Sequence, residues 1–209
     1  ATIYWLLPRQ LYRIGLLIAA SLGFIGIYDK FAVIVILVLT IYTFTFAALI
    51  EGGKNKKLFH RLGIVGLVIV LTGFKYLGFL ATTLSNLAAF VVDLPKFNID
   101  SILLPLGISY IVFKYISYLT DIYWGIVKKG TFVDFLLYGA LFTIYVAGPI
   151  ERFERFNPQI KEKKKFQTLY LEDAFRRIVF GFLKKLVIAD WIGYFVALVW
   201  ENQAQYSLE

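Results

Sequence analysis

The sequence has no cysteine and no methionine, and it contains a single histidine among its 209 residues. The absence of cysteine excludes disulfides, thiolate nucleophiles and cysteine metal sites, and it leaves the redox compartment open. One histidine without other ligands grouped nearby cannot form a zinc site, so we expect no bound metal. Because no methionine is present, we do not expect Ala1 to be the natural start of the protein.

Charge is also scarce, and apolar residues dominate. Hydrophobic residues make up 59% of the sequence, against roughly 45–50% in a soluble domain, and the mean hydropathy is +0.72. These values indicate an integral membrane protein. The net charge is +8, but the basic residues lie in short loops between apolar runs. The positive-inside rule explains that pattern better than nucleic-acid binding does, so the expected partner is the lipid bilayer.

Long apolar runs predict an all-α, multi-pass transmembrane helical bundle that forms one membrane domain over residues 1–209. The predicted spans are residues 14–28, 31–50 and 62–80. The first two form a helical hairpin, and the apolar character after the third continues to residue 92 in a second short or interfacial helix. Residues 51–61 form a lysine-rich loop, which the positive-inside rule assigns to the cytoplasm.

Two later segments depart from simple spans. Residues 132–150 are apolar enough to cross, yet basic loops flank them on both sides, which predicts a re-entrant or tilted helix that does not cross. Ala147-Gly148-Pro149 is the expected break in that helix. Residues 168–190 are amphipathic, which predicts an interfacial helix on the cytoplasmic side.

Polar residues inside the apolar stretch 101–125 are the main candidates for function. If the helix begins near Ile108, then Tyr110, Lys114, Ser117 and Asp121 recur at i, i+4, i+7 and i+11 and share one stripe. A lysine and a carboxylate in such a segment are costly unless they face a bundle interior or a watery cavity. The stripe is therefore either a functional site or a buried polar contact that fixes helix packing.

A second candidate follows the expected break, in the sequence AGPIERFERF at residues 147–156. Its arginines suit an anionic ligand such as a phosphate-bearing cofactor. The alternative is a membrane-edge turn with interfacial cations. By contrast, His60 lies in the lysine-rich loop, where we expect it to be exposed and a poor catalytic base.

Three motifs in order resemble the amino-terminal half of the membrane-bound O-acyltransferases. They are LLPLGISYIVFKYISYLTDIYWG, AGPIERFERFNPQI and FGFLKKLVIAD. Within the family the motifs are similar to those of the bacterial branch that acts in alginate O-acetylation and teichoic-acid D-alanylation. The resemblance covers residues 103–190 well and the earlier spans loosely.

This resemblance implies a helical fold around a tunnel in the bacterial plasma (inner) membrane. An acyl thioester, acetyl-CoA or an acyl carrier protein, would donate from the cytoplasm, and a hydroxyl of a cell-envelope polysaccharide would accept. An acyl carrier or an extracytoplasmic acyltransferase is the implied partner. The family's essential histidine would act as general base, but nothing in this sequence matches it, so we expect no catalytic residue in this chain.

The carried-over motif positions have the expected roles of shaping the tunnel and contacting the donor. Together with Lys114 from the stripe, they are Pro105, Gly107, Ser109, Ser117, Asp121, Gly148, Pro149 and Arg152. The full-length protein is then expected to be an O-acyltransferase, and acetyl is the acyl group that we expect it to transfer. The alternatives are a non-catalytic membrane subunit, a transporter-like scaffold whose stripe lines a permeation path, or a truncated piece without activity of its own.

Overall fold

The computed structural model describes residues 2–53, 55–88, 105, 107–145, 148–162 and 167–201. The chain divides into two compact units, Ala1–Lys163 and Lys164–Glu209. We describe each unit by itself, and the expectation of one membrane domain stays a prediction. Every regular element within the described ranges is helical, as the apolar runs predict.

The first unit begins with a short helix, α1 (Thr2–Leu6), and then three long apolar helices. These are α2 (Gln10–Tyr28), α3 (Lys30–Gly52) and α4 (Lys56–Ala88). Among the described residues, α2, α3 and the first part of α4, Lys56–Tyr76, are long and apolar enough to cross a membrane. The predicted hairpin is confirmed: Asp29 separates α2 from α3, and its carboxylate accepts a hydrogen bond from the backbone N–H of Ala32 at 3.0 Å.

Helix α4 differs from the expected third span. It begins at Lys56 rather than at residue 62, and it continues as one helix to Ala88 instead of ending near residue 80. The sequence gives the reason, because no proline occurs between these bounds and the glycines there are tolerated in a packed helix. Residues 89–92, where a second helix was expected, lie outside the described residues.

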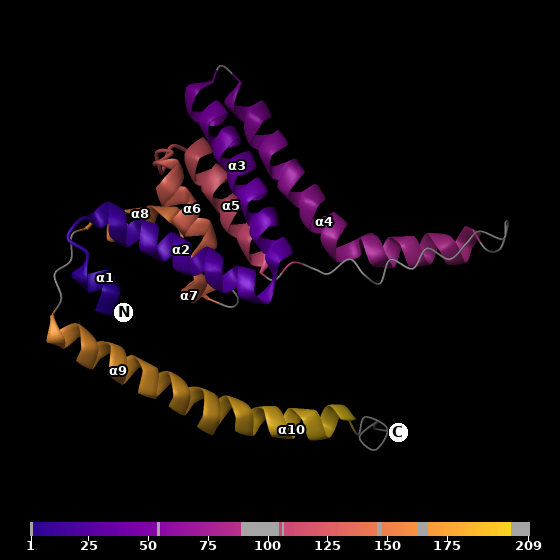
Figure 1. The fold of residues 1–209 in the computed structure, drawn as a ribbon. Helices are drawn as coiled ribbons and strands as arrows, with labels where there is room; N and C mark the ends of the chain where they lie inside the picture. Colours follow the sequence, from indigo (N-terminus) through magenta and orange to yellow (C-terminus); the bar gives the residue numbers. More distant parts are fainter. Residues whose placement is uncertain are drawn as a thin grey trace. The chain divides into compact units, whose positions relative to one another are not determined.

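Helix α3 is the centre of the first unit. It packs against α2, α4 and α5, and Figure 1 shows α3 and α4 as a hairpin with α5 beside α3. The hydroxyl of Tyr42 on α3 donates a hydrogen bond to the carbonyl of Leu62 at 2.9 Å. A Cβ at Gly66 would come within 2.0 Å of the Tyr42 hydroxyl, so this glycine permits the close approach of the two helices.

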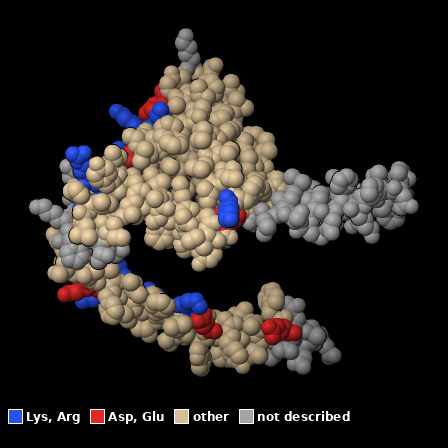
Figure 2. All heavy atoms as spheres, viewed as in Figure 1, with Lys and Arg blue, Asp and Glu red and all other residues tan. Residues whose placement is uncertain are grey.

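The surface of α3 that faces away from these neighbours is apolar. Ile34, Val38 and Ile41 are all exposed and recur on one helical face. On the face that Figure 2 shows, most of the described surface of the first unit is uncharged, and the charged atoms form a few small patches. An exposed apolar surface of this kind is a liability in water and is ordinary against lipid, so the chain is a membrane protein.

The second half of the first unit consists of one longer helix and three short ones. They are α5 (Ile108–Tyr123), α6 (Phe132–Ala140), α7 (Phe142–Tyr145) and α8 (Phe153–Lys161). Gly107 precedes α5 in the left-handed conformation, with φ of +73°. Helix α5 therefore begins at Ile108, the residue on which the predicted polar stripe depends.

The segment predicted to be re-entrant is broken earlier than expected. Helix α6 has nine residues, which gives a length of about 14 Å, against roughly 30 Å for the membrane core. It ends at Ala140, and α7 begins only at Phe142, so the first break lies at Leu141. Gly148 and Pro149 are also outside helices, while Val146 and Ala147 lie outside the described residues. Two short helices support a segment that does not cross, which stays a prediction.

An aromatic cluster holds α5, α6 and α8 together. The ring of Phe135 on α6 stacks on Tyr118 of α5, with centroids 4.3 Å apart. Phe153, the first residue of α8, meets the ring of Tyr138 edge-on at 5.3 Å. All four rings are buried. The cluster fixes the start of α8 against α5 and α6, and this brings the two candidate sites into one region.

The second unit is one helical run over residues 168–201. Helix α9 (Thr168–Leu183) continues through a π-helical turn (Lys184–Ala189) into α10 (Asp190–Glu201). The boundary expected at residue 190 is therefore not a break in the helix. Lys185 and Asp190 span the π-helical turn as an ion pair at 2.9 Å. None of the described residues of this unit is buried.

Candidate functional site

The polar stripe of α5 lies inside the first unit. The side chain of Lys114 is 1% exposed and that of Asp121 is 3% exposed, while Tyr110 and Ser117 are half-buried. The Lys114 ammonium donates a hydrogen bond to the backbone carbonyl of Tyr138 on α6. It also lies 4.1 Å from the centre of the Tyr138 ring, which is a close cation–π contact.

The segment after the predicted break lies beside this stripe. The Tyr138 hydroxyl donates a hydrogen bond to the backbone carbonyl of Glu151 at 2.8 Å. The negative charge of Glu151 interacts with Lys114 and with Tyr110. Tyr138 therefore joins the two motifs that the sequence suggested separately.

Asp121 makes the second connection between the motifs. It lies one turn after Ser117 on α5, and its carboxylate interacts electrostatically with the positive charge of Arg152. Arg152 is the residue that precedes α8. The Arg152 charge thus complements the buried carboxylate of Asp121. Arg152 itself is exposed.

Several buried polar atoms of α5 have no partner within the described part of the chain. They are the hydroxyls of Tyr110 and Tyr118 and the Oδ2 atom of Asp121. An unpaired buried polar atom costs about 1–3 kcal/mol, so native proteins almost always give it water or a ligand. Three such atoms on the same helix as Lys114 leave hydrogen-bonding capacity for water or a polar ligand inside the first unit.

The remaining predicted positions have different surroundings. Pro105 is buried, and its carbonyl accepts a hydrogen bond from the N–H of Ile108. A Cβ on Gly107 would lie 2.8 Å from the carbonyl oxygen of Tyr145, and one on Gly148 would lie 2.6 Å from the Cα of Ile144. Both glycines therefore permit close backbone approaches, which is a structural role in shaping the site.

Two predicted residues are not brought to the stripe by any described contact. Ser109 is half-buried near the start of α5, and Pro149 is exposed. No group of three or more histidine, cysteine or acidic side chains suited to a metal occurs within the described ranges. The chemistry of the site is therefore that of an ammonium, a guanidinium, two carboxylates and tyrosine hydroxyls.

The expectation that His60 is an exposed loop residue is wrong. Since α4 begins at Lys56, the histidine lies in the first turns of a helix and is half-buried. Its ring stacks on Tyr123 of α5, with centroids 4.4 Å apart and an interplanar angle of 12°. Its Nε2 atom lies 3.3 Å from the Thr120 hydroxyl. The absence of a breaker after Gly53 was the signal that could have predicted this.

The chain is similar to curated bacterial proteins whose names describe the acylation of polymers. A protein named "Probable alginate O-acetylase AlgI" from Pseudomonas syringae pv. tomato is 30% identical over 192 residues, which cover 90% of this chain. A protein of the same name from Azotobacter vinelandii is 31% identical over 194 residues, again 90% of this chain. The chain belongs to the membrane-bound O-acyltransferase family. It spans 37% and 38% of the length of these two relatives.

Further relatives of the chain carry other names. A "Peptidoglycan O-acetyltransferase" of Helicobacter pylori is 25% identical over 184 residues, 75% of this chain and 34% of the relative. A "Teichoic acid D-alanyltransferase" of Streptococcus thermophilus is 34% identical over 96 residues, 45% of this chain and 23% of the relative. No family model matches the sequence, and no solved structure matches it either.

Proposed function

We propose that the complete protein is a multi-pass enzyme of the bacterial plasma membrane that transfers an acyl group, most readily acetyl, to hydroxyls of a cell-envelope polysaccharide. The donor is a cytoplasmic thioester, acetyl-CoA or an acyl carrier protein. The names of the similar proteins support transfer to an envelope polymer. The observation that carries the proposal is that Tyr138 contacts both the buried ammonium of Lys114 and the backbone of Glu151, the residue before Arg152.

The residues of this site suit a thioester donor. In the transfer, the acceptor oxygen bonds to the thioester carbonyl carbon, the carbon–sulfur bond breaks, and the thiol leaves with a proton. Negative charge develops on the carbonyl oxygen, so fixed donors aimed at that oxygen lower the barrier. We assign this role to the buried ammonium of Lys114, with the unpaired hydroxyl of Tyr110 one turn before it. We assign no side chain of this chain to the proton transfer itself.

The surroundings of the site suit the same role. Arg152 is exposed at the edge of the unit and has the planar donor set that recognises phosphate groups of a carrier. The aromatic walls formed by Tyr115, Tyr118 and Phe135 are buried. Such walls exclude water that would otherwise hydrolyse a thioester. Beyond the bilayer, the expected partners are an acyl carrier or an extracytoplasmic acyltransferase.

The test uses acyl transfer by the complete protein in membrane vesicles. We expect Asp121→Asn and Arg152→Gln each to lower the rate by about 10- to 100-fold, since each removes one charge of the site. Because the two residues act together, the double variant should lose little more than either single one. The matched control is Arg155→Gln, which removes an exposed arginine three residues further along.

The amount of folded protein in the membrane is measured beside each rate. Full activity of both single variants would overturn the proposed role of the site and leave the polar stripe as a packing contact. If activity and the amount of folded protein are lost together, the result also supports a packing role. Activity lost from a folded protein, with Arg155→Gln unaffected, supports the proposal.

A further inference from the structure

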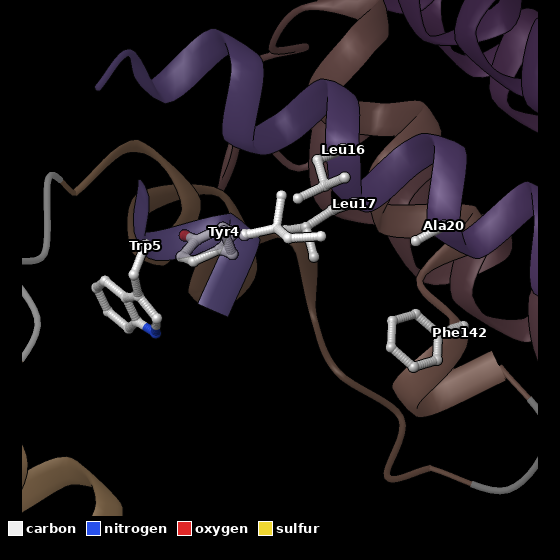
Figure 3. A pocket seen from close by; sticks show the side chains of 7 residues that line it. Tyr4, Trp5, Leu16, Leu17, Ala20 and Phe142 are labelled. Carbon is white, nitrogen blue, oxygen red and sulfur yellow. The ribbon is translucent and has the colours of Figure 1, made fainter. Parts of the chain in front are cut away.

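A second feature of the first unit lies away from the polar stripe. An apolar groove of about 520 Å³ opens between α1, α2 and α7. Tyr4 and Trp5 line it from α1, Leu16 and Ala20 from α2, and Phe142 from α7, as Figure 3 shows. The volume falls in the range of small-ligand sites, which is roughly 300–1,000 Å³. None of these residues belongs to the site described above.

The cation of Arg13 lies beside this groove. Its guanidinium is 5.2 Å from the centre of the Tyr4 ring and 5.5 Å from that of Trp5, the two aromatic residues of the lining. It also donates hydrogen bonds to the carbonyls of Leu7 at 2.9 Å and Trp5 at 3.5 Å. Arg13 therefore holds α1 against α2 and keeps a positive charge next to an apolar surface.

The amino-terminal segment that forms this groove carries only positive charge. Residues 1–28 contain Arg9 and Arg13 and no acidic residue or lysine. Arg9 is exposed and lies 6.0 Å from the centre of the Tyr12 ring. Tryptophan, tyrosine and arginine side chains in this arrangement are typical of the level of lipid headgroups. An apolar groove beside them is open to an acyl chain, and the cations complement a phosphate.

We propose that this groove binds one acyl chain of an anionic phospholipid, whose phosphate lies against Arg9 and Arg13. The apolar lining takes the chain, and the arginines select a headgroup with net negative charge over a zwitterionic one. Bound lipid of this kind would tie α1 to α2 and α7 at the membrane surface. The site is separate from the acyl-transfer site and does not depend on it.

Fluorescence quenching of Trp5 tests the proposal directly. The protein is reconstituted in nanodiscs that contain either brominated phosphatidylglycerol or brominated phosphatidylcholine, because bromine quenches a tryptophan that it contacts. The contribution of Trp5 is the difference between the wild type and Trp5→Phe, since Trp124, Trp191 and Trp200 remain in both. We expect phosphatidylglycerol to quench the Trp5 signal more strongly than phosphatidylcholine.

Matched variants separate the groove from the surrounding lipid. Ala20→Phe fills the groove and should reduce the quenching, whereas Ala19→Phe adds the same ring next to it at a residue outside the lining. Arg9→Gln should raise the phosphatidylglycerol concentration for half-quenching about fivefold. Lys128→Gln, which removes an exposed cation after α5, should leave it unchanged. Arg9 is chosen because Arg13 also holds α1 in place.

Three results would overturn the proposal. Equal quenching by the two lipids would mean that the groove meets only the bulk bilayer. No quenching of Trp5 by either lipid would mean that protein, from this chain or a partner, fills the groove. Quenching that Ala20→Phe leaves unchanged would place the lipid outside it.

Discussion

The ammonium of Lys114 lies 4.1 Å from the ring centre of Tyr138 and donates a hydrogen bond to the carbonyl of that same residue. No ion pair within the described part of the chain includes this lysine. Burying an ammonium group without a paired carboxylate is costly, and replacing buried charged groups by apolar side chains of similar volume is often neutral or stabilising. The arrangement therefore favours a functional reason for the lysine.

Gly107 gives a prediction about the start of α5. Its φ of +73° is unfavourable for other residues, and a Cβ would lie 2.8 Å from the Tyr145 carbonyl oxygen. We expect Gly107→Ala to destabilise the protein by at least about 1–2 kcal/mol. The control is Gly23→Ala on α2, where no atom lies within 4 Å of the added Cβ. That change should stabilise the helix by about 0.5–1 kcal/mol.

Thermal unfolding of the purified protein in detergent measures both glycine variants. The expected order of Tm is Gly23→Ala above the wild type and Gly107→Ala below it. Equal Tm values for the two variants would contradict the left-handed conformation at Gly107.

His60 gives a prediction about the contact between α4 and α5. Because its ring stacks on Tyr123, we expect His60→Phe to keep the stacking and the Tm, while His60→Ala loses about 0.5–1.5 kcal/mol. The acyl-transfer rate of the complete protein should survive His60→Phe. A folded but inactive His60→Phe protein would show instead that the imidazole takes part in the chemistry.

The path of the chain between α5 and α8 gives a third prediction. The backbone N–H of Lys129 donates a hydrogen bond to the Glu51 carboxylate at 3.3 Å, so the ends of α3 and α5 lie together. If α6 and α7 do not cross the membrane, Glu154 lies on that side too. Single cysteines are introduced at Lys128, Glu154 and Lys30, since these 209 residues contain no other cysteine.

Labelling of these cysteines from each side of the membrane shows whether the segment between α5 and α8 crosses. We expect Lys128→Cys and Glu154→Cys to react from the cytoplasm and Lys30→Cys, at the first residue of α3, to react only from outside. Reaction of Lys128→Cys and Glu154→Cys from opposite sides would show that the segment crosses.

The helical period of α5, and therefore its polar stripe, could be predicted from the sequence alone. The spacing of Tyr110, Lys114, Ser117 and Asp121 depends only on where the helix begins, and Gly107 sets that point. The partners of the stripe could not be predicted in this way. Tyr138, which joins it to Glu151, comes from α6 through tertiary packing, and no local pattern marks that contact.

The boundaries of the helices were predicted less well, for two physical reasons. Charged residues near Lys56 looked like a loop, but lysine and arginine are good helix formers, so α4 begins there and takes up His60. The break at Leu141 has no proline or glycine at that residue, and beside it the N–H of Phe142 donates a tertiary hydrogen bond to the Ser21 hydroxyl of α2. Only the later break at Gly148 and Pro149 had a local signal.

The central claim is that Lys114 serves acyl transfer rather than folding, and one pair of variants tests it. Lys114→Met replaces the buried lysine of α5 with an apolar chain of similar length, and Lys75→Met makes the same change at an exposed lysine of α4. We expect both complete proteins to fold with an unchanged or higher Tm. Acyl transfer should fall about 100-fold in Lys114→Met and remain near the wild-type rate in Lys75→Met. A folded Lys114→Met protein with full activity would contradict the claim.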